Sequence, residues 1–180
     1  MTRLELRLAG LGGHGIIFMG RILGYAAIYA GKDVAMATSY SPAQRGGWSK
    51  ADLVISDEPI DYPLVSKPEV LVATTQEMLM NEINSLKPNG ILIVDEDLVK
   101  ISDDIRSKYK VYAAPAMRIS EEVAGTSRAA NMVLLGVLVA VTGVVEPKHI
   151  EESIKSSVRR KEMIEPNIKA FNKGYSIYKS

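Results

Sequence analysis

The run Gly10-Leu11-Gly12-Gly13-His14-Gly15 sets glycines in a Gly-x-Gly-x-x-Gly spacing close to the start of the chain. Residues 4–9, just before it, alternate Leu with Glu, Arg and Ala, which is the period-two pattern of a half-buried strand. Residues 16–30, just after it, repeat apolar side chains near the 3.6-residue period of a helix, and Gly31 stands where such a helix ends. The stretch predicts a strand, a tight glycine turn and a helix, the opening unit of an α/β fold.

The rest of the chain alternates further strands and helices. Strands are expected at residues 33–38, 51–56, 69–74, 91–95 and 111–113, and helices at 76–86, 120–124, 128–141, 147–157 and 164–178. Residues 39–50 are too few for a helical crossover, so the strands on either side should run antiparallel or stay unpaired. We predict a three-layer α/β/α fold with a mixed, mostly parallel, Rossmann-like sheet and a helical C-terminal part.

Length and composition describe an ordinary globular chain. Its 180 residues fit one domain, 1–180, with 47% apolar and 24% charged residues. A net charge of +1 gives no reason to expect nucleic acid or a membrane surface as a partner. The longest apolar run, residues 132–145, is shorter than a bilayer requires and reads as a buried helix. Residues 1–5 do not resemble a signal peptide, so a cytoplasmic location is expected.

The side-chain inventory excludes several kinds of site. The chain has no cysteine, which excludes disulfides, thiolate catalysis and cysteine-held iron–sulfur clusters on this polypeptide. His14 and His149, the two histidines, are far apart in sequence, which argues against an imidazole-based zinc site. The acids Asp95-Glu96-Asp97 follow a strand and indicate a solvated turn rather than a metal site. No Ser–His–Asp set or supported pair of catalytic carboxylates stands out, so we expect no catalytic residue and no metal.

The glycine motif leaves two interpretations open. In the first, Gly10 permits the tight turn, Gly12 lets a phosphate approach the backbone, and Gly15 allows close packing of helix on strand. In the second, the glycines only let the loop pack against another chain. A nicotinamide dinucleotide is rejected, because an acidic residue should end the second strand and residues 35–38 are Ala-Met-Ala-Thr. Asp33 begins that strand, at the wrong edge of the sheet.

A second segment, residues 39–48, should reach the same sheet edge. Arg45 offers planar donors for a carboxylate or phosphate, and Gly46 and Gly47 leave the backbone approachable. Tyr40 and Trp48, the only tryptophan, supply amphipathic surface. Composition alone also fits a long β-turn whose arginine pairs with a local carboxylate.

Taken together, these segments resemble a known family. Gly10-Leu-Gly-Gly-His-Gly-Ile-Ile, Thr38-Ser-Tyr-Ser-Pro-Ala-Gln-Arg-Gly-Gly, Ile55-Ser-Asp-Glu-Pro-Ile-Asp-Tyr-Pro and Asn131-Met-Val-Leu-Leu-Gly-Val-Leu are similar, in order and spacing, to the gamma subunit of 2-oxoacid:ferredoxin oxidoreductases. The stretch from Ser56 is most like the 2-oxoglutarate type, the KorC type. His14 departs from the family pattern, which has glutamine there, and its imidazole could titrate near neutral pH.

The resemblance implies a component of an enzyme complex rather than a self-sufficient enzyme. Such complexes oxidatively decarboxylate a 2-oxoacid to acyl-CoA and reduce ferredoxin, using thiamine diphosphate, Mg, iron–sulfur clusters and coenzyme A. The implied partners are alpha, beta and delta-type subunits and, through the complex, ferredoxin; alone, the chain could form a homodimer. By the same resemblance, one rim of a coenzyme A site would be Gly10, Gly12, Gly13, His14 and Gly15, and the other Ser39, Tyr40, Arg45, Gly46 and Gly47.

A second function from a different class stays open beside this one. A self-sufficient nucleotide- or CoA-binding α/β enzyme could use the same glycine loop. The missing ribose-binding acid and the absence of an evident acid, base or nucleophile favour the non-catalytic subunit.

Overall fold

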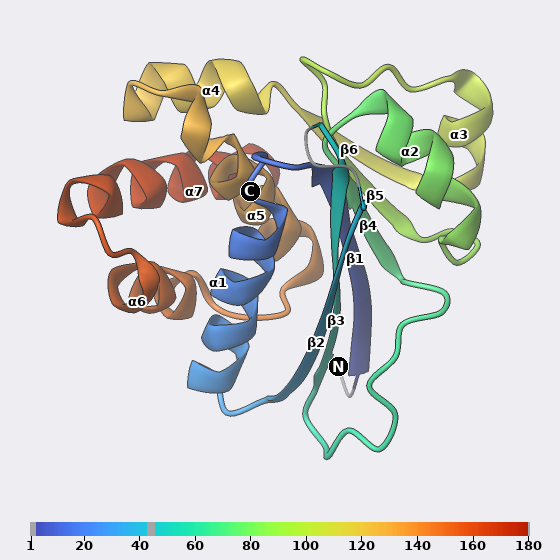
Figure 1. Ribbon diagram of the computed structural model, residues 1–180, viewed down its shortest axis with the longest axis horizontal. Coiled ribbons are helices and arrows are strands. Elements are labelled where there is room, and N and C mark those ends of the chain that lie inside the picture. Colours follow the sequence, from blue (N-terminus) through green and yellow to red (C-terminus); the bar gives the residue numbers. More distant parts are fainter. Residues whose placement is uncertain (1–2, 43–45, 180) are drawn as a thin grey trace.

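The computed structural model describes residues 3–42 and 46–179. In this part of the chain six strands form one sheet in the order β2-β3-β1-β4-β5-β6 (Figure 1). Their bounds are β1 (Arg3–Leu11), β2 (Asp33–Tyr40), β3 (Trp48–Ser56), β4 (Val70–Ala73), β5 (Ile91–Asp95) and β6 (Lys110–Ala114). The glycine motif therefore begins inside a strand that has neighbours on both sides.

The sheet is mixed, as predicted. β3 pairs antiparallel with both β1 and β2, whereas the pairs β1–β4, β4–β5 and β5–β6 are parallel. β2 and β3 form a long hairpin, in register from Asp33 opposite Ser56 to Tyr40 opposite Ser49. Strands joined by so short a segment were expected to run antiparallel or to stay unpaired, and the structure has the antiparallel pairing.

Helices cover both faces of the sheet, and this confirms the three-layer prediction (Figure 1). One face carries α1 (Ile16–Tyr29), α4 (Ala116–Ala124), α5 (Ala130–Thr142), α6 (Pro147–Ser157) and α7 (Ile164–Tyr178), and the other carries α2 (Gln76–Glu82) and α3 (Asp103–Lys108). The 3-10 turns are η1 (Ile83–Ser85), η2 (Ser127–Ala129) and η3 (Lys161–Met163). A separate apolar cluster fills the space on each face of the sheet.

The alternation in β1 divides its side chains between the two faces. Leu4, Leu6 and Leu8 enter the larger cluster, on the face of the sheet where α1 packs. Arg7 points to the other face, where its guanidinium donates two bonds of 2.8 Å to the carboxylate of Asp52 and one of 3.0 Å to Glu82. A guanidinium this enclosed stays in place because paired carboxylates offset its desolvation.

α5 is the central helix of the larger layer. Every residue from Asn131 to Val139 is buried, which confirms the predicted buried helix. A Cβ added to Gly136 would lie 2.2 Å from the carbonyl oxygen of Phe171, and one added to Gly174 would lie 2.0 Å from that of Val133. The two glycines let α5 and α7 approach backbone to backbone. No helix in the described part of the chain is long and apolar enough to cross a membrane.

Some element boundaries differ from the prediction. The expected helix 120–124 begins earlier, at Ala116, because the Asp95 carboxylate accepts the Ala116 N–H at 3.0 Å and caps the helix from β5. The expected helix 76–86 ends at Glu82 and continues as η1, where the Ser85 hydroxyl donates to the Glu82 carbonyl. The expected helix 128–141 starts as the 3-10 turn η2. α3 was not predicted, although Ser102 caps it by accepting the Ile105 N–H.

A tyrosine hydrogen-bonds the outward backbone groups of one residue in the edge strand β6. The Tyr178 hydroxyl accepts the N–H of Ala113 at 3.2 Å and donates to the carbonyl of the same residue at 2.8 Å. Its ring meets that of Tyr112 edge to face, with centroids 5.1 Å apart. The outward backbone groups of β6 at Ala113 are therefore satisfied within the chain.

Candidate functional site

The glycine loop joins the carboxyl end of β1 to the start of α1. A Cβ on Gly10 would lie 2.2 Å from the Thr74 hydroxyl oxygen, so glycine lets β4 end against the loop. The Gly12 N–H donates to the Gly47 carbonyl at 2.7 Å and so joins the loop to the β2–β3 connection. Gly15 has a φ of +70° and caps α1 in the left-handed region, which favours glycine.

The first turn of α1 has N–H groups unpartnered within the helix, next to the glycine loop. Among residues 3–42 and 46–179 no side chain caps this turn, and no acidic residue stands in it. The first N–H groups of a helix lack partners within the helix and carry partial positive charge. Phosphate and carboxylate groups bind well at such a terminus.

A hollow of about 480 Å³ lies in front of this turn, and we call it the rim hollow. One wall is the glycine loop and the first turn of α1, and the other is the β2–β3 connection. Its lining residues are Gly12, Gly13, Gly15, Ile16, Ile17, Phe18, Tyr40, Ser41, Gly46, Gly47, Trp48 and Ser49. The two segments that the sequence singled out therefore face each other across one opening.

Not every expected site residue lines the rim hollow. Gly12, Gly13, Gly15, Tyr40, Gly46 and Gly47 do. Gly10 and Ser39 are paired within the sheet, opposite Ser49 and Lys50. His14 lines a different cavity, and Arg45 lies outside the described residues.

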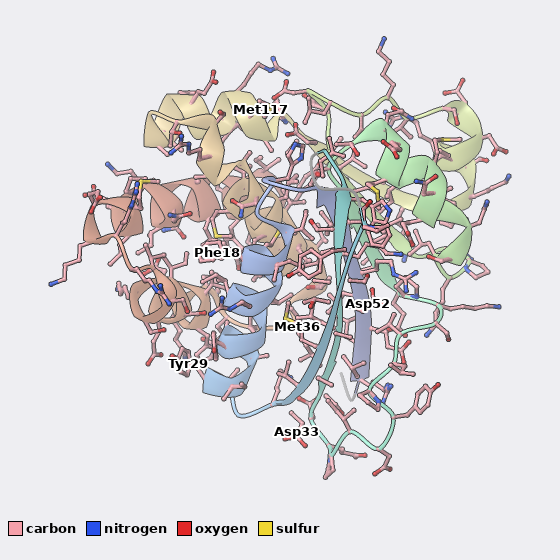
Figure 2. All side chains as sticks on the ribbon, viewed as in Figure 1. Phe18, Tyr29, Asp33, Met36, Asp52 and Met117 are labelled. Atoms are coloured by element: carbon pink, nitrogen blue, oxygen red, sulfur yellow. The ribbon has the colours of Figure 1, made fainter. Side chains whose placement is uncertain are left out.

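That second cavity, of about 250 Å³, we call the switch-point cavity. α1 and α2 follow the neighbouring strands β1 and β4 but cover opposite faces of the sheet, and a crevice opens where the connections diverge in this way. Its lining residues are Gly13, His14, Thr74, Asp95, Leu98, Met117, Ser127, Arg128, Ala130, Asn131 and Leu134. Figure 2 shows Met117 at the end of the sheet where the glycine loop lies, and Asp33 at the opposite end.

Two titratable groups of the switch-point cavity are shifted by burial. Burial lowers the pKa of His14, whose Nδ1 lies 2.9 Å from the Thr74 hydroxyl. Burial raises the pKa of the Asp95 carboxyl, while the backbone N–H groups of Asp97 and Ala116 favour its ionised form. Asp95 is 2% exposed, so the prediction of a solvated turn at this residue was wrong. Its carboxylate is buried because it caps α4 across the sheet edge.

Sequence reasoning missed Thr74, Asp95, Arg128 and Asn131, which belong to this cavity. Thr74 and Asp95 follow or end buried parallel strands, where α/β proteins place their ligand sites, so the strand pattern could have indicated them. Asn131 begins a segment that carries the family resemblance, but no local pattern places it or Arg128 beside the loop, because the packing of α5 brings them there.

Comparison with known proteins identifies the family. The pyruvate ferredoxin/flavodoxin oxidoreductase family matches residues 5–177. The chain belongs to this family.

Several members of this family resemble the chain over nearly its whole length. The 2-oxoglutarate synthase subunit KorC of Methanothermobacter thermautotrophicus is 46% identical over 162 residues, which cover 87% of this chain and 86% of that protein. The keto/oxoacid ferredoxin oxidoreductase gamma subunit from Geobacter sulfurreducens has the same fold, with a TM-score of 0.81, 35% identity and 96% coverage of both chains.

A longer relative contains the same fold as one part. The 2-oxoglutarate:ferredoxin oxidoreductase from Magnetococcus marinus matches with a TM-score of 0.89 at 24% identity. The match covers 99% of this chain but 31% of that one. At this identity the likeness establishes the fold alone.

Proposed function

We propose that this chain is the gamma-type subunit of a 2-oxoglutarate:ferredoxin oxidoreductase, and that its glycine loop forms part of the coenzyme A site of that complex. The complex oxidatively decarboxylates the 2-oxoacid, transfers the acyl group to coenzyme A and reduces ferredoxin. The rim hollow, which opens onto an uncapped helix N-terminus, is the observation that supports the coenzyme A role.

The residues of the rim hollow suit the phosphate-bearing end of coenzyme A. The N–H groups at the start of α1 donate to phosphate oxygens, and the glycines keep the backbone accessible. Tyr40 is 61% exposed at the end of β2 and offers a ring for the ligand to lie against. Arg45, from the same connection, is our candidate for a phosphate or for a carboxylate of a partner subunit.

We assign the other cofactors to partner subunits of the alpha, beta and delta types. This chain holds no cysteine for an iron–sulfur cluster, and its described residues bring together no group of three His, Asp or Glu side chains that could hold a metal ion. Thiamine diphosphate with Mg²⁺ and the clusters would be bound there, and ferredoxin would meet the complex. We also propose that residues 1–180 form one domain, that the protein is cytoplasmic, and that the isolated chain forms a homodimer.

The self-sufficient enzyme is less well supported by the site. A dinucleotide or nucleotide enzyme of this fold would place an acid at the end of β2, but Thr38, Ser39 and Tyr40 stand there. Asp33 lies at the far end, opposite Ser56.

The test is a tyrosine pair in the assembled complex. Tyr40→Ala removes a ring from the rim hollow, and Tyr62→Ala removes one that is also 61% exposed but outside it. We expect Tyr40→Ala to raise the KM for coenzyme A about three- to tenfold, because ligand contact area is lost. Tyr62→Ala should leave that KM unchanged, and Arg45→Ala should raise it or weaken subunit assembly.

Steady-state kinetics with varied coenzyme A distinguish the outcomes. If Tyr40→Ala and Arg45→Ala both leave the KM for coenzyme A and the assembly unchanged, the loop is not part of that site. An equal effect of Tyr40→Ala and Tyr62→Ala would indicate general destabilisation instead.

A further inference from the structure

The side chain of Asn131 joins α5 to the glycine loop by a hydrogen bond. It lies in the first turn of α5 and is 6% exposed. Its Nδ2 donates to the carbonyl oxygen of Gly15 at 3.1 Å, across 116 residues of sequence. A Cβ on Gly15 would lie 2.3 Å from that Nδ2, so the absence of a side chain at residue 15 is what lets the amide reach the carbonyl.

The other end of the same amide has no partner. The Oδ1 of Asn131 is buried and accepts no hydrogen bond from the described residues. Turning the amide over would set Oδ1 against the Gly15 carbonyl, which also only accepts, so the bond to Gly15 fixes the orientation. A buried acceptor without a partner is unfavourable and rare in folded proteins. The amide's favourable contact at this place is therefore the bond that Nδ2 makes to Gly15.

The Gly15 carbonyl determines where the first helical N–H points. This oxygen accepts both the Asn131 amide and the N–H of Met19, the latter at 2.9 Å. In a trans peptide the N–H of the next residue points opposite to the carbonyl. With the carbonyl held toward α5 and along the helix, the N–H of Ile16 is directed out of the helix terminus. Ile16 lines the rim hollow.

We infer that Asn131 is a positioning residue for ligand binding at the glycine loop. It holds the Gly15–Ile16 peptide so that the donors at the start of α1 stay aimed into the rim hollow. The ligand class is a phosphate-bearing one, and the inference rests on the proposed coenzyme A role of that hollow. Two further contacts support the loop elsewhere, Gly12 to Gly47 and His14 to Thr74, but Asn131 alone among them acts at the helix terminus.

A second buried asparagine supplies a matched control. Asn167 in α7 is 7% exposed, and its Nδ2 donates to the carbonyl of Met163 at 2.6 Å. Asn131→Ala and Asn167→Ala thus each remove one buried amide bonded to one backbone carbonyl. Both variants should lose thermal stability.

The two variants should differ in the assembled complex. We expect Asn131→Ala to raise the KM for coenzyme A about three- to tenfold with kcat at saturating coenzyme A unchanged, since the donors are misdirected but the chemistry is remote. Asn167→Ala should leave both constants unchanged. An unchanged KM in Asn131→Ala would overturn the inference. Failure of both Asn131→Ala and Asn131→Ser to assemble, while Asn167→Ala assembles, would also overturn it, because Asn131 would then be needed for folding.

A double-mutant cycle tests the contact itself. Gly15→Ala presses a methyl group against Asn131, so its effect on KM should be smaller in the Asn131→Ala background. Strictly independent effects of the two changes would contradict the contact. The Tyr40 pair separates this inference from the proposed function. An effect of Tyr40→Ala without an effect of Asn131→Ala rejects only the positioning role. No effect of Tyr40→Ala, Arg45→Ala or Asn131→Ala on the KM or the assembly rejects the coenzyme A role.

Discussion

His14 is the only titratable side chain of the glycine loop, and its setting is half-buried. The ring is stripped of part of its water, which lowers its pKa, and it lies 2.9 Å from the Thr74 hydroxyl. The folded loop therefore favours the neutral form of the imidazole. When the chain unfolds, the ring regains water and binds a proton more readily.

This setting predicts a pH dependence of stability. As pH falls through the ordinary histidine value of about 6.5, the unfolded chain takes up a proton that the folded chain still refuses, so the free energy of unfolding decreases. His14→Gln keeps an amide beside Thr74 and cannot titrate, so its melting temperature should fall less between pH 7 and pH 5. Thermal denaturation at half-unit steps measures this, with the range above pH 7.5 as control, where the two proteins should run parallel. Identical slopes below pH 6.5 would contradict it.

The residues of the two loops also show which parts of the site could be predicted from the sequence. The glycine motif and the β2–β3 connection were correctly expected at one sheet edge, because strand–turn–helix signals are local. Gly10 serves close packing rather than the turn, and His14 faces away from the rim hollow. Thr74 and Asn131 could not be assigned to the loop from sequence, since contacts across 60 and 116 residues depend on how strands and helices assemble.

At the scale of elements, α5 and α7 form the tightest contact described. The sequence pattern marks 128–141 as an apolar helix, and such a helix is expected to be buried. The sequence pattern does not predict that Gly136 packs against the backbone of Phe171 and Tyr175. Helix 164–178 was predicted with its observed bounds, yet the partner of Gly174 was not predictable, because helix pairing is a property of the packed layer.

Replacing a helical glycine by alanine should therefore change the free energy of unfolding by different amounts at different positions. Gly136→Ala would place its Cβ 2.2 Å from a backbone oxygen, so the helices must separate, and we expect a loss of about 3 kcal/mol in the free energy of unfolding. Gly24→Ala in α1 would meet only Val34 at 3.6 Å, and should be neutral or stabilise by about 0.5–1 kcal/mol. Urea denaturation compares the two. Equal losses would show that the α5–α7 contact is not the cause.

For the whole molecule, the arrangement of layers followed from the order of strands and helices in the chain. Buried strands, short connections and late helices indicated a mixed three-layer fold, and the structure has it. What sequence order leaves undetermined is which surfaces remain for partners. Asp95 illustrates this: a group that looks solvated in sequence is enclosed once α4 docks on β5.

If this chain supplies only a binding rim and its partner subunits supply the catalytic centre, as proposed, the chain should not turn over alone. We expect the purified chain to show no 2-oxoglutarate- and coenzyme A-dependent reduction of ferredoxin or of a viologen dye. Activity should appear when the partner subunits are added back, because the redox cofactors are proposed to reside there. Turnover by the isolated chain at rates comparable to the complex would support the self-sufficient enzyme instead.

The contact between Tyr178 and β6 can form only after the C-terminal end of the chain has been synthesised. Ala113 and Tyr178 are 65 residues apart, so a ribosome adding about 5–20 residues per second leaves the outward N–H and C=O of Ala113 without this partner for roughly 3–13 seconds. During that interval we expect this part of the edge strand to be open to pairing with another nascent chain. High expression, with many ribosomes on one messenger, should therefore favour inclusion bodies. Slower growth at low temperature does not shorten the time for which Ala113 lacks its partner, but it lowers the number of nascent chains that are in this state together.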